Sequence, residues 1–258
     1  MIIEKLKRNL SEQHACLEKT NVAMKIVSPN VNLKDYKRFL SAMWLGFSVV
    51  EPRLSEAKFD DGNDSESGGF SYEGVSELLT RDLEDLGVPV DELERYGQDV
   101  GFGPPMISRQ LNEKGFLENG TAKNDFQKRC LESETTNLGL QCAHSQDRLQ
   151  ACLAGVRYVA EGSALGGIFL SKYLRTKLDF DQLASRFLDC GRERVRRFDI
   201  LKEYYALKFD DKDLKDMIAG GKIAFHVFSQ AFQIAEDISL ADPYFHPRPT
   251  STHIVKEK

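Results

Sequence analysis

Hydrophobic residues recur every three or four positions along most of the chain, which is the spacing of one face of an α-helix. No segment of useful length alternates apolar and polar residues, so we expect no β-strand. The pattern predicts an all-α protein with a single domain over residues 1–240. The periodic segments are Ile2 to about Lys19, Leu33 to about Pro52, Tyr72 to Leu86, Ser145 to Lys177, Asp179 to Phe209 and Asp211 to Ile238.

Residues of known local preference mark several ends of these segments. Asn32 is the expected N-cap of the helix that starts at Leu33, and Gly87 is the expected stop of the helix before it. Gly191 is a candidate break inside the segment 179–209. Three further segments are expected to be irregular: an acidic, glycine-rich loop at 60–69, loops with short helices at 97–143, and an extended or disordered tail at 241–258.

The charge and the apolar runs exclude some classes of function. The net charge of −5 gives no basic excess to neutralise phosphates, which argues against nucleic acid as a partner. No apolar run is long enough to span a bilayer, and the N-terminus lacks a signal-peptide core, so we expect a cytoplasmic protein without membrane insertion. The five cysteines show no zinc-binding spacing and are expected to be free thiols (Cys16, Cys130, Cys142, Cys152 and Cys190).

Two features carry candidate chemistry. His14 and Glu18 lie four residues apart, on one face of the first helix. A metal-ligating histidine commonly gives its other N–H to such a carboxylate, although the pair also fits an ordinary surface contact. The second feature is a helix interior with glycine at 162, 166 and 167, each of which costs about 1 kcal/mol relative to alanine. A flat ligand against the backbone, a kink, close helix packing, or a glycine turn that joins two helices would explain these glycines.

Both features resemble motifs of the bacterial heme oxygenases. The run Tyr158-Val-Ala-Glu-Gly-Ser-Ala-Leu-Gly-Gly is similar to their distal-helix motif. The start, Leu6 to Glu18, is similar to their proximal helix. The resemblance extends to the segments at 28–36 and 79–87, and so covers about three quarters of the chain. Family members connect the helix that ends at Gly87 to the distal helix more directly, so residues 97–143 would be an insertion.

The resemblance implies a heme sandwiched between the proximal helix and a kinked, glycine-rich distal helix. His14 would be the axial ligand of the iron, and Glu18 would be its partner. Gly162, Ser163 and Gly166 would form the catalytic distal face, with Gly167 also against the heme. Lys7 and Tyr158 match positions that contact the heme propionates. The basic run Arg192 to Arg197, with Lys202, would either add cations there or form a solvated helix face.

The function implied is cleavage of heme to biliverdin, CO and Fe²⁺, with heme as substrate and cofactor. Electrons would come from a ferredoxin or a flavoprotein reductase, because the chain has no nucleotide-binding glycine motif. A non-catalytic heme-binding or heme-sensing protein on the same fold is the alternative. A helical enzyme unrelated to heme is a third possibility. His226, in an apolar run, is the second candidate for the iron ligand.

Overall fold

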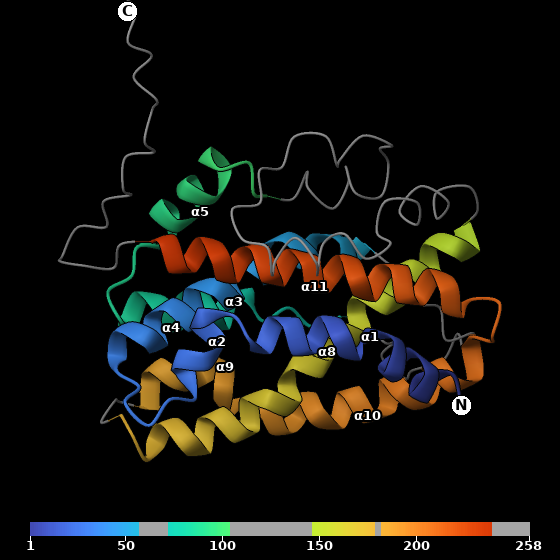
Figure 1. Cartoon of the computed structure of the whole chain (residues 1–258), viewed down its shortest axis with the longest axis horizontal. Helices are drawn as coiled ribbons and strands as arrows, with labels where there is room; N and C mark the ends of the chain where they lie inside the picture. The colour runs from blue at the N-terminus through green and yellow to red at the C-terminus, as the bar shows by residue number, and fades with distance from the viewer. Residues whose placement is uncertain (57–71, 104–145, 179–181, 239–258) are drawn as a thin grey trace, which may run out of the picture.

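The computed structural model describes residues 1–56, 72–103, 146–178 and 182–238, and this part of the chain is helical and contains no strand. The expectation of an all-α protein is confirmed for these residues (Figure 1). The helices are α1 (Ile2–Glu18), α2 (Asn21–Ile26), α3 (Leu33–Glu56), α4 (Ser76–Asp85), α5 (Val90–Asp99), α8 (Gln146–Arg175), the short 3₁₀ helix η2 (Gln182–Ser185), α9 (Arg186–Asp189), α10 (Gly191–Lys208) and α11 (Leu214–Asp237).

Most predicted helices lie where the periodicity put them. α3 continues through Pro52, and the segment 179–209 breaks before Gly191 into η2, α9 and α10. α2 and α5 were not predicted. The predicted loop at 60–69, all but the first residues of the insertion at 97–143, and the tail at 241–258 lie outside the described residues.

The predicted helix ends are confirmed in their hydrogen bonds. The side chain of Asn32 accepts from the backbone N–H of Asp35 at 3.1 Å, and the Asp35 carboxylate accepts in return from the Asn32 N–H at 3.2 Å. Gly87 takes φ +71°, and Val88 N–H then bonds back to the Leu83 carbonyl at 2.8 Å. This is the glycine-dependent stop expected at a helix C-terminus.

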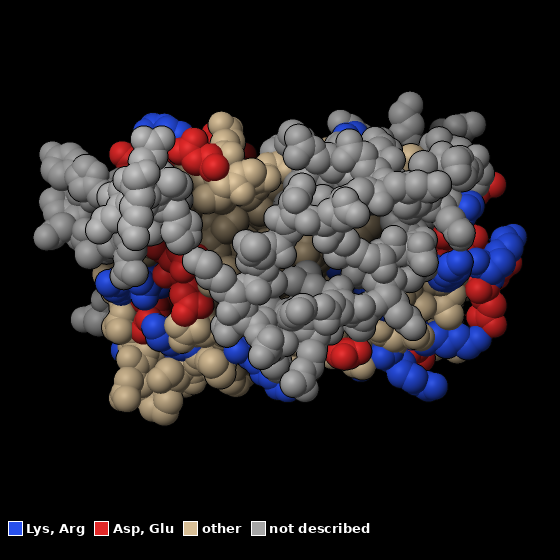
Figure 2. All heavy atoms as spheres, turned by 45° about the horizontal axis from the view of Figure 1, so that its top comes forward, with Lys and Arg blue, Asp and Glu red and all other residues tan. Residues whose placement is uncertain are grey.

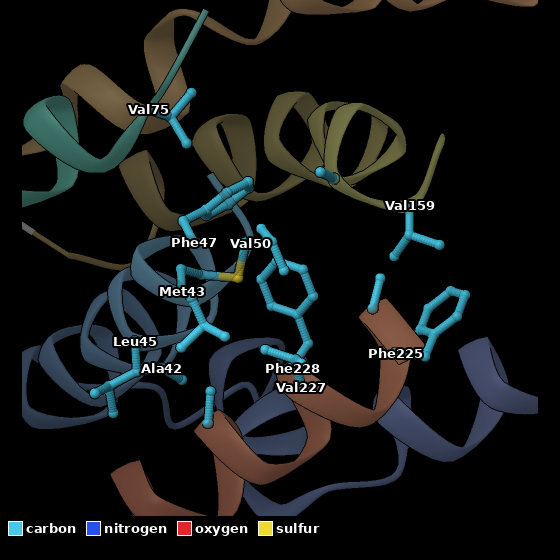
Figure 3. Packing of buried hydrophobic residues seen from close by; sticks show 14 of the residues in the cluster. Ala42, Met43, Leu45, Phe47, Val50, Val75, Val159, Phe225, Val227 and Phe228 are labelled. Atoms are coloured by element: carbon cyan, nitrogen blue, oxygen red, sulfur yellow. The ribbon is translucent and has the colours of Figure 1, made fainter. Parts of the chain in front are cut away.

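The core forms where α8, α11 and α3 meet. Phe228 of α11 lies among side chains of α3, with its ring edge toward Phe47 at a centroid distance of 5.2 Å (Figure 3). α1 packs on α11, and α10 packs on α8. Two glycines bring α8 and α11 together: a Cβ on Gly155 would lie 1.9 Å from the Met217 carbonyl oxygen, and one on Gly220 would lie 1.8 Å from that of Cys152. Close helix packing thus depends on glycines outside the motif at 162–167.

α8 is one continuous helix through all of its glycines. A glycine turn that joins two helices, one of the explanations open from the sequence, is therefore excluded. The ribbon changes direction between its first and last turns (Figure 1), in keeping with the expected bend. The stretch of α8 from Ala151 to Arg157 is buried on all sides, whereas the part after Gly162 leaves one face exposed.

Candidate functional site

His14 lies on the exposed side of α1 near its C-terminal end. Its side chain is 60% exposed, and its Nδ1 lies 3.5 Å from a carboxylate oxygen of Glu18. The other ring nitrogen, Nε2, has no hydrogen bond or ion pair within the described part of the chain. The pair thus has the arrangement of a metal-ligating histidine, with one nitrogen oriented by a carboxylate and the other available.

The ring of His14 packs against α11. The rings of His14 and Phe225 make a T-shaped contact, with centroids 5.9 Å apart and planes at 84°. One turn earlier, Leu10 lies so close to Gly221 that a Cβ there would be 2.4 Å from its Cδ1. Because Gly221 has no side chain, α1 lies close to α11 at this point. The close approach sets the position of His14 relative to α11.

The glycines of α8 differ in their surroundings. A Cβ on Gly162 would meet the ring of Phe198 at 3.4 Å, an ordinary contact. A Cβ on Gly166 or Gly167 would meet no described atom within 4 Å. The backbone at these two positions is therefore open, as the close approach of a flat ligand requires.

Two large apolar side chains beside the open glycines are exposed. Leu165 is 53% exposed and Phe169 is 62% exposed, although both lie in the middle of a long helix. The Phe169 ring stacks on Tyr173 at a centroid distance of 6.1 Å. This part of α8 thus presents an apolar surface to solvent, next to backbone without side chains.

The exposed face of α8 runs beside the N-terminal helices. At one end, the hydroxyl of Tyr173 donates to the Ser28 carbonyl at 2.6 Å, just after α2. At the other end, burial, and then the nearby Glu4 carboxylate of α1, raise the pKa of Tyr158. The open glycines lie between these two points on α8, and His14 lies between them on the N-terminal helices. Met24 of α2 and Val27, the residue after α2, are also exposed.

Ser163 has both of its hydrogen-bonding functions engaged. Its hydroxyl donates to the Ala160 carbonyl at 2.7 Å and accepts from a guanidinium N–H of Arg194 at 3.1 Å. The same nitrogen of Arg194 also donates to the Ala160 carbonyl at 3.1 Å. The serine predicted for the distal face is therefore tied to α10.

The basic run on α10 divides into exposed and interior residues. Arg192 and Arg196 are exposed, whereas Arg194 is buried and Arg197 is partly buried. The alternative of a wholly solvated helix face is therefore wrong, because α10 packs on α8 on the side that carries Arg194. Lys202 pairs with Asp199 at 2.7 Å and lies over the ring of Phe198, 5.0 Å from its centroid.

A buried charge cluster under α8 was not recognised from the sequence. Glu161, 2% exposed, has the Arg157 guanidinium at 3.7 Å and that of Arg197 at 3.5 Å. Arg197 also pairs with Glu73. Arg157 and Glu161 are four residues apart and are the only charged residues between Arg148 and Lys172 of α8, and this spacing was the available signal.

Two further expectations concern histidine and cysteine. His226 of α11 is partly buried, and burial lowers its pKa to about 4, which keeps it neutral. The expectation that no cysteine forms a disulfide is wrong for Cys16, which is disulfide-bonded, whereas Cys152 and Cys190 are not in a disulfide. The spacing of cysteines along a chain does not reveal which thiols the fold brings together, so the disulfide of Cys16 could not be predicted from the sequence.

No group of three or more metal-ligating side chains occurs within the described residues. A heme iron needs no such group, since the porphyrin supplies four nitrogens and the protein one axial ligand. None of the described helices is both long and apolar enough to cross a membrane. Acidic and basic side chains alternate over the described surface in Figure 2, with no broad face of one sign in that view.

The comparisons with known proteins add no family. Neither the models of protein families nor the curated proteins give a match to this sequence. The assignment of a function therefore depends on the arrangement of the residues described above.

Proposed function

We propose that the chain binds heme between α1 and α8 and cleaves it as a heme oxygenase. One observation carries the proposal: His14 has a free Nε2 on the N-terminal helices, and these helices run beside a stretch of α8 with open glycines and exposed apolar side chains. A porphyrin is flat and apolar, and its iron takes an imidazole as axial ligand. Hydrophobic burial of Leu165 and Phe169 under such a ligand would contribute to affinity.

The surrounding residues fit the two kinds of edge that a heme presents. Its propionates are anionic, and Lys7 lies exposed two turns before His14, on the same helix. Lys202 and the exposed Arg192 and Arg196 supply further cations on α10. Tyr158 lies against Phe198, at a ring distance of 5.3 Å, and can donate its hydroxyl to a carboxylate. Exposed cations on α1 and α10, together with the apolar surface of α8, would suit this amphipathic ligand.

The protein side of the reaction consists of ligation, orientation and restriction of space. Heme itself supplies the redox chemistry when bound, with O₂ and external electrons. His14 would hold the iron, and Glu18 would orient the imidazole. Gly166 and Gly167 would leave room for a small molecule and carry no side chain that could act as a second ligand. Ser163 and Arg194 lie behind this stretch of α8, where the Arg194 guanidinium donates to the Ser163 hydroxyl. Electrons are proposed to come from a ferredoxin or a flavoprotein reductase.

The first test is the visible spectrum of the purified chain titrated with hemin. We expect one heme per chain, with the Soret band of a histidine-ligated ferric heme. His14→Ala should lose this band shape, and added imidazole should restore it, because the small ligand refills the vacated position. His226→Gln serves as the control and should keep the wild-type spectrum. An unchanged spectrum in His14→Ala would remove His14 as the ligand and point to His226.

A second measurement separates an enzyme from a heme-binding protein. The complex is supplied with ascorbate in air, with catalase present to remove free peroxide. An enzyme should lose its Soret band while a broad bilin absorption grows in the red. A complex that keeps its heme intact through repeated reduction and oxidation would contradict the proposed enzymatic reaction and leave heme binding as the function.

A further inference from the structure

Three arginines lie in the interior beside α8, and one of them differs from the others in its partners. Arg157 and Arg197 share the carboxylate of Glu161. Arg194, only 5% exposed, has no carboxylate within ion-pair distance in the described part of the chain. Two other buried acids nearby, Glu51 and Asp82, accept from backbone N–H groups: Glu51 from those of Val75 and Ser76, and Asp82 from those of Arg186 and Phe187.

Neutral groups take the place of water around Arg194. Its guanidinium donates to the Ala160 carbonyl and to the Ser163 hydroxyl, both at 3.1 Å. It lies 5.6 Å from the ring centroid of Phe47 and 5.4 Å from that of Phe187. Aromatic faces stabilise a cation without cancelling its charge. An arginine stays charged throughout the physiological range of pH, so the interior here carries a positive charge with no direct counterion.

This charge lies next to the open stretch of α8. Ser163, which Arg194 contacts, directly follows Gly162 and comes three residues, less than one helical turn, before Gly166. A charge inside a poorly solvated protein acts more strongly on a neighbouring site than it would through water. Burying an unpaired charge is costly, and such groups gather where a protein uses them.

We propose that Arg194 makes the space beside Gly166 and Gly167 selective for small anionic ligands over neutral ones. The inference rests on the proposed function, since the small ligand would bind to the heme that His14 is proposed to hold. Arg194 acts from behind α8, through its charge and through its hold on Ser163, and is therefore a positioning residue. The glycines set the size of the ligand, and Arg194 sets its preferred charge.

The test compares one anionic and one neutral ligand of the ferric heme complex. Azide is the anion and imidazole the neutral ligand, each titrated by visible spectroscopy at constant ionic strength. Arg194→Gln keeps hydrogen-bond donors but removes the charge. We expect its azide affinity to fall roughly tenfold, with imidazole affinity unchanged. Arg194→Lys, which keeps the charge, should stay near the wild type. Lys208→Met removes an exposed charge from the far end of α10 and should alter neither affinity.

A second variant tests the same charge without removing the arginine. Ser163→Asp places a carboxylate on the guanidinium and should lower azide affinity in the same direction, so the test does not depend on the folding of Arg194→Gln. Equal loss of azide and imidazole affinity, or no change in azide affinity in either variant, would overturn the proposal while leaving heme binding intact. A wild-type chain that gives no histidine-ligated spectrum with hemin would instead overturn the proposed function, and this inference with it.

Discussion

Alanine substitutions at the glycines of α8 and α11 should change stability in opposite directions. Gly166→Ala and Gly167→Ala add a methyl group that meets no described atom within 4 Å. Each should therefore gain the helix-propensity difference of about 1 kcal/mol. Gly155→Ala and Gly220→Ala make the same chemical change where the new methyl would lie within 2 Å of a carbonyl oxygen on the facing helix.

The loss of stability expected for Gly155→Ala and Gly220→Ala follows from the atoms that would have to move. The obstructing atoms are backbone atoms of Met217 and Cys152, which cannot rotate away as a side chain can. An ordinary contact begins at 3.4 Å, so α8 and α11 would have to separate by about 1.5 Å. A gap of only about 1 Å already forfeits up to half of the dispersion energy of each pair of atoms. Overpacking of this kind costs about 1–3 kcal/mol or more, which exceeds the gain in helix propensity.

Chemical denaturation of the apo protein measures both effects. We expect Gly155→Ala and Gly220→Ala to lose about 2 kcal/mol of unfolding free energy, or roughly 5 °C in Tm for a chain of this size. Gly166→Ala should gain a few degrees. A neutral or stabilising result at Gly155 would refute the close approach of α8 to α11. Loss of stability at Gly166 would show that the space there is filled in the apo protein.

Three other predictions concern ligand access, pH and the packing of α9. Gly166→Leu should keep the fold but weaken hemin binding by tenfold or more, as measured by Soret titration beside Gly166→Ala; equal affinities would place the heme elsewhere. Burial lowers the pKa of His226 to about 4, below that of a histidine in the unfolded chain. The neutral side chain therefore contributes up to about 3 kcal/mol of unfolding free energy above pH 6.5, and this contribution is lost as the pH falls toward 4. His226→Gln should show a smaller acid loss in urea unfolding between those pH values, and identical slopes would contradict the assignment. Asp82→Ala should cost about 3 kcal/mol by thermal unfolding, because Asp82 is fully buried and accepts from the backbone N–H groups of Arg186 and Phe187; a loss below about 1 kcal/mol would refute this role.

The long helices could be predicted because each buries one apolar face over several turns. α2 and α5 could not, since each is too short or too polar for its period to show: α5 has only Leu93 and Gly97 buried. The caps at Asn32 and Gly87 were predictable because they depend on local backbone geometry. The packing glycines were not, since a sequence does not tell which helices cross at Gly155 and Gly220.

For the candidate site, the sequence identified the residue types but not their surroundings. His14 and Glu18 could be paired by spacing alone, because both lie on one helix. The separate roles within the basic run of α10 depend on how that helix packs on α8, which no spacing within α10 reveals. The sequence therefore grouped Arg194 with the neighbouring cations, and only the structure shows its contact with Ser163.

The two halves of α8 explain how a site of this kind can be both rigid and open. The first half, which is buried on all sides from Ala151 to Arg157, is held against α11 by the contacts at Gly155 and Gly220. The second half continues the same helix beyond that contact, so its position is fixed even though one face touches no described atoms at Gly166 and Gly167. Arg194 and Phe198 of α10 support this half from another side, through Ser163 and Gly162. A ligand that binds the open face therefore meets a preformed surface, and α8 loses little conformational entropy when the ligand binds.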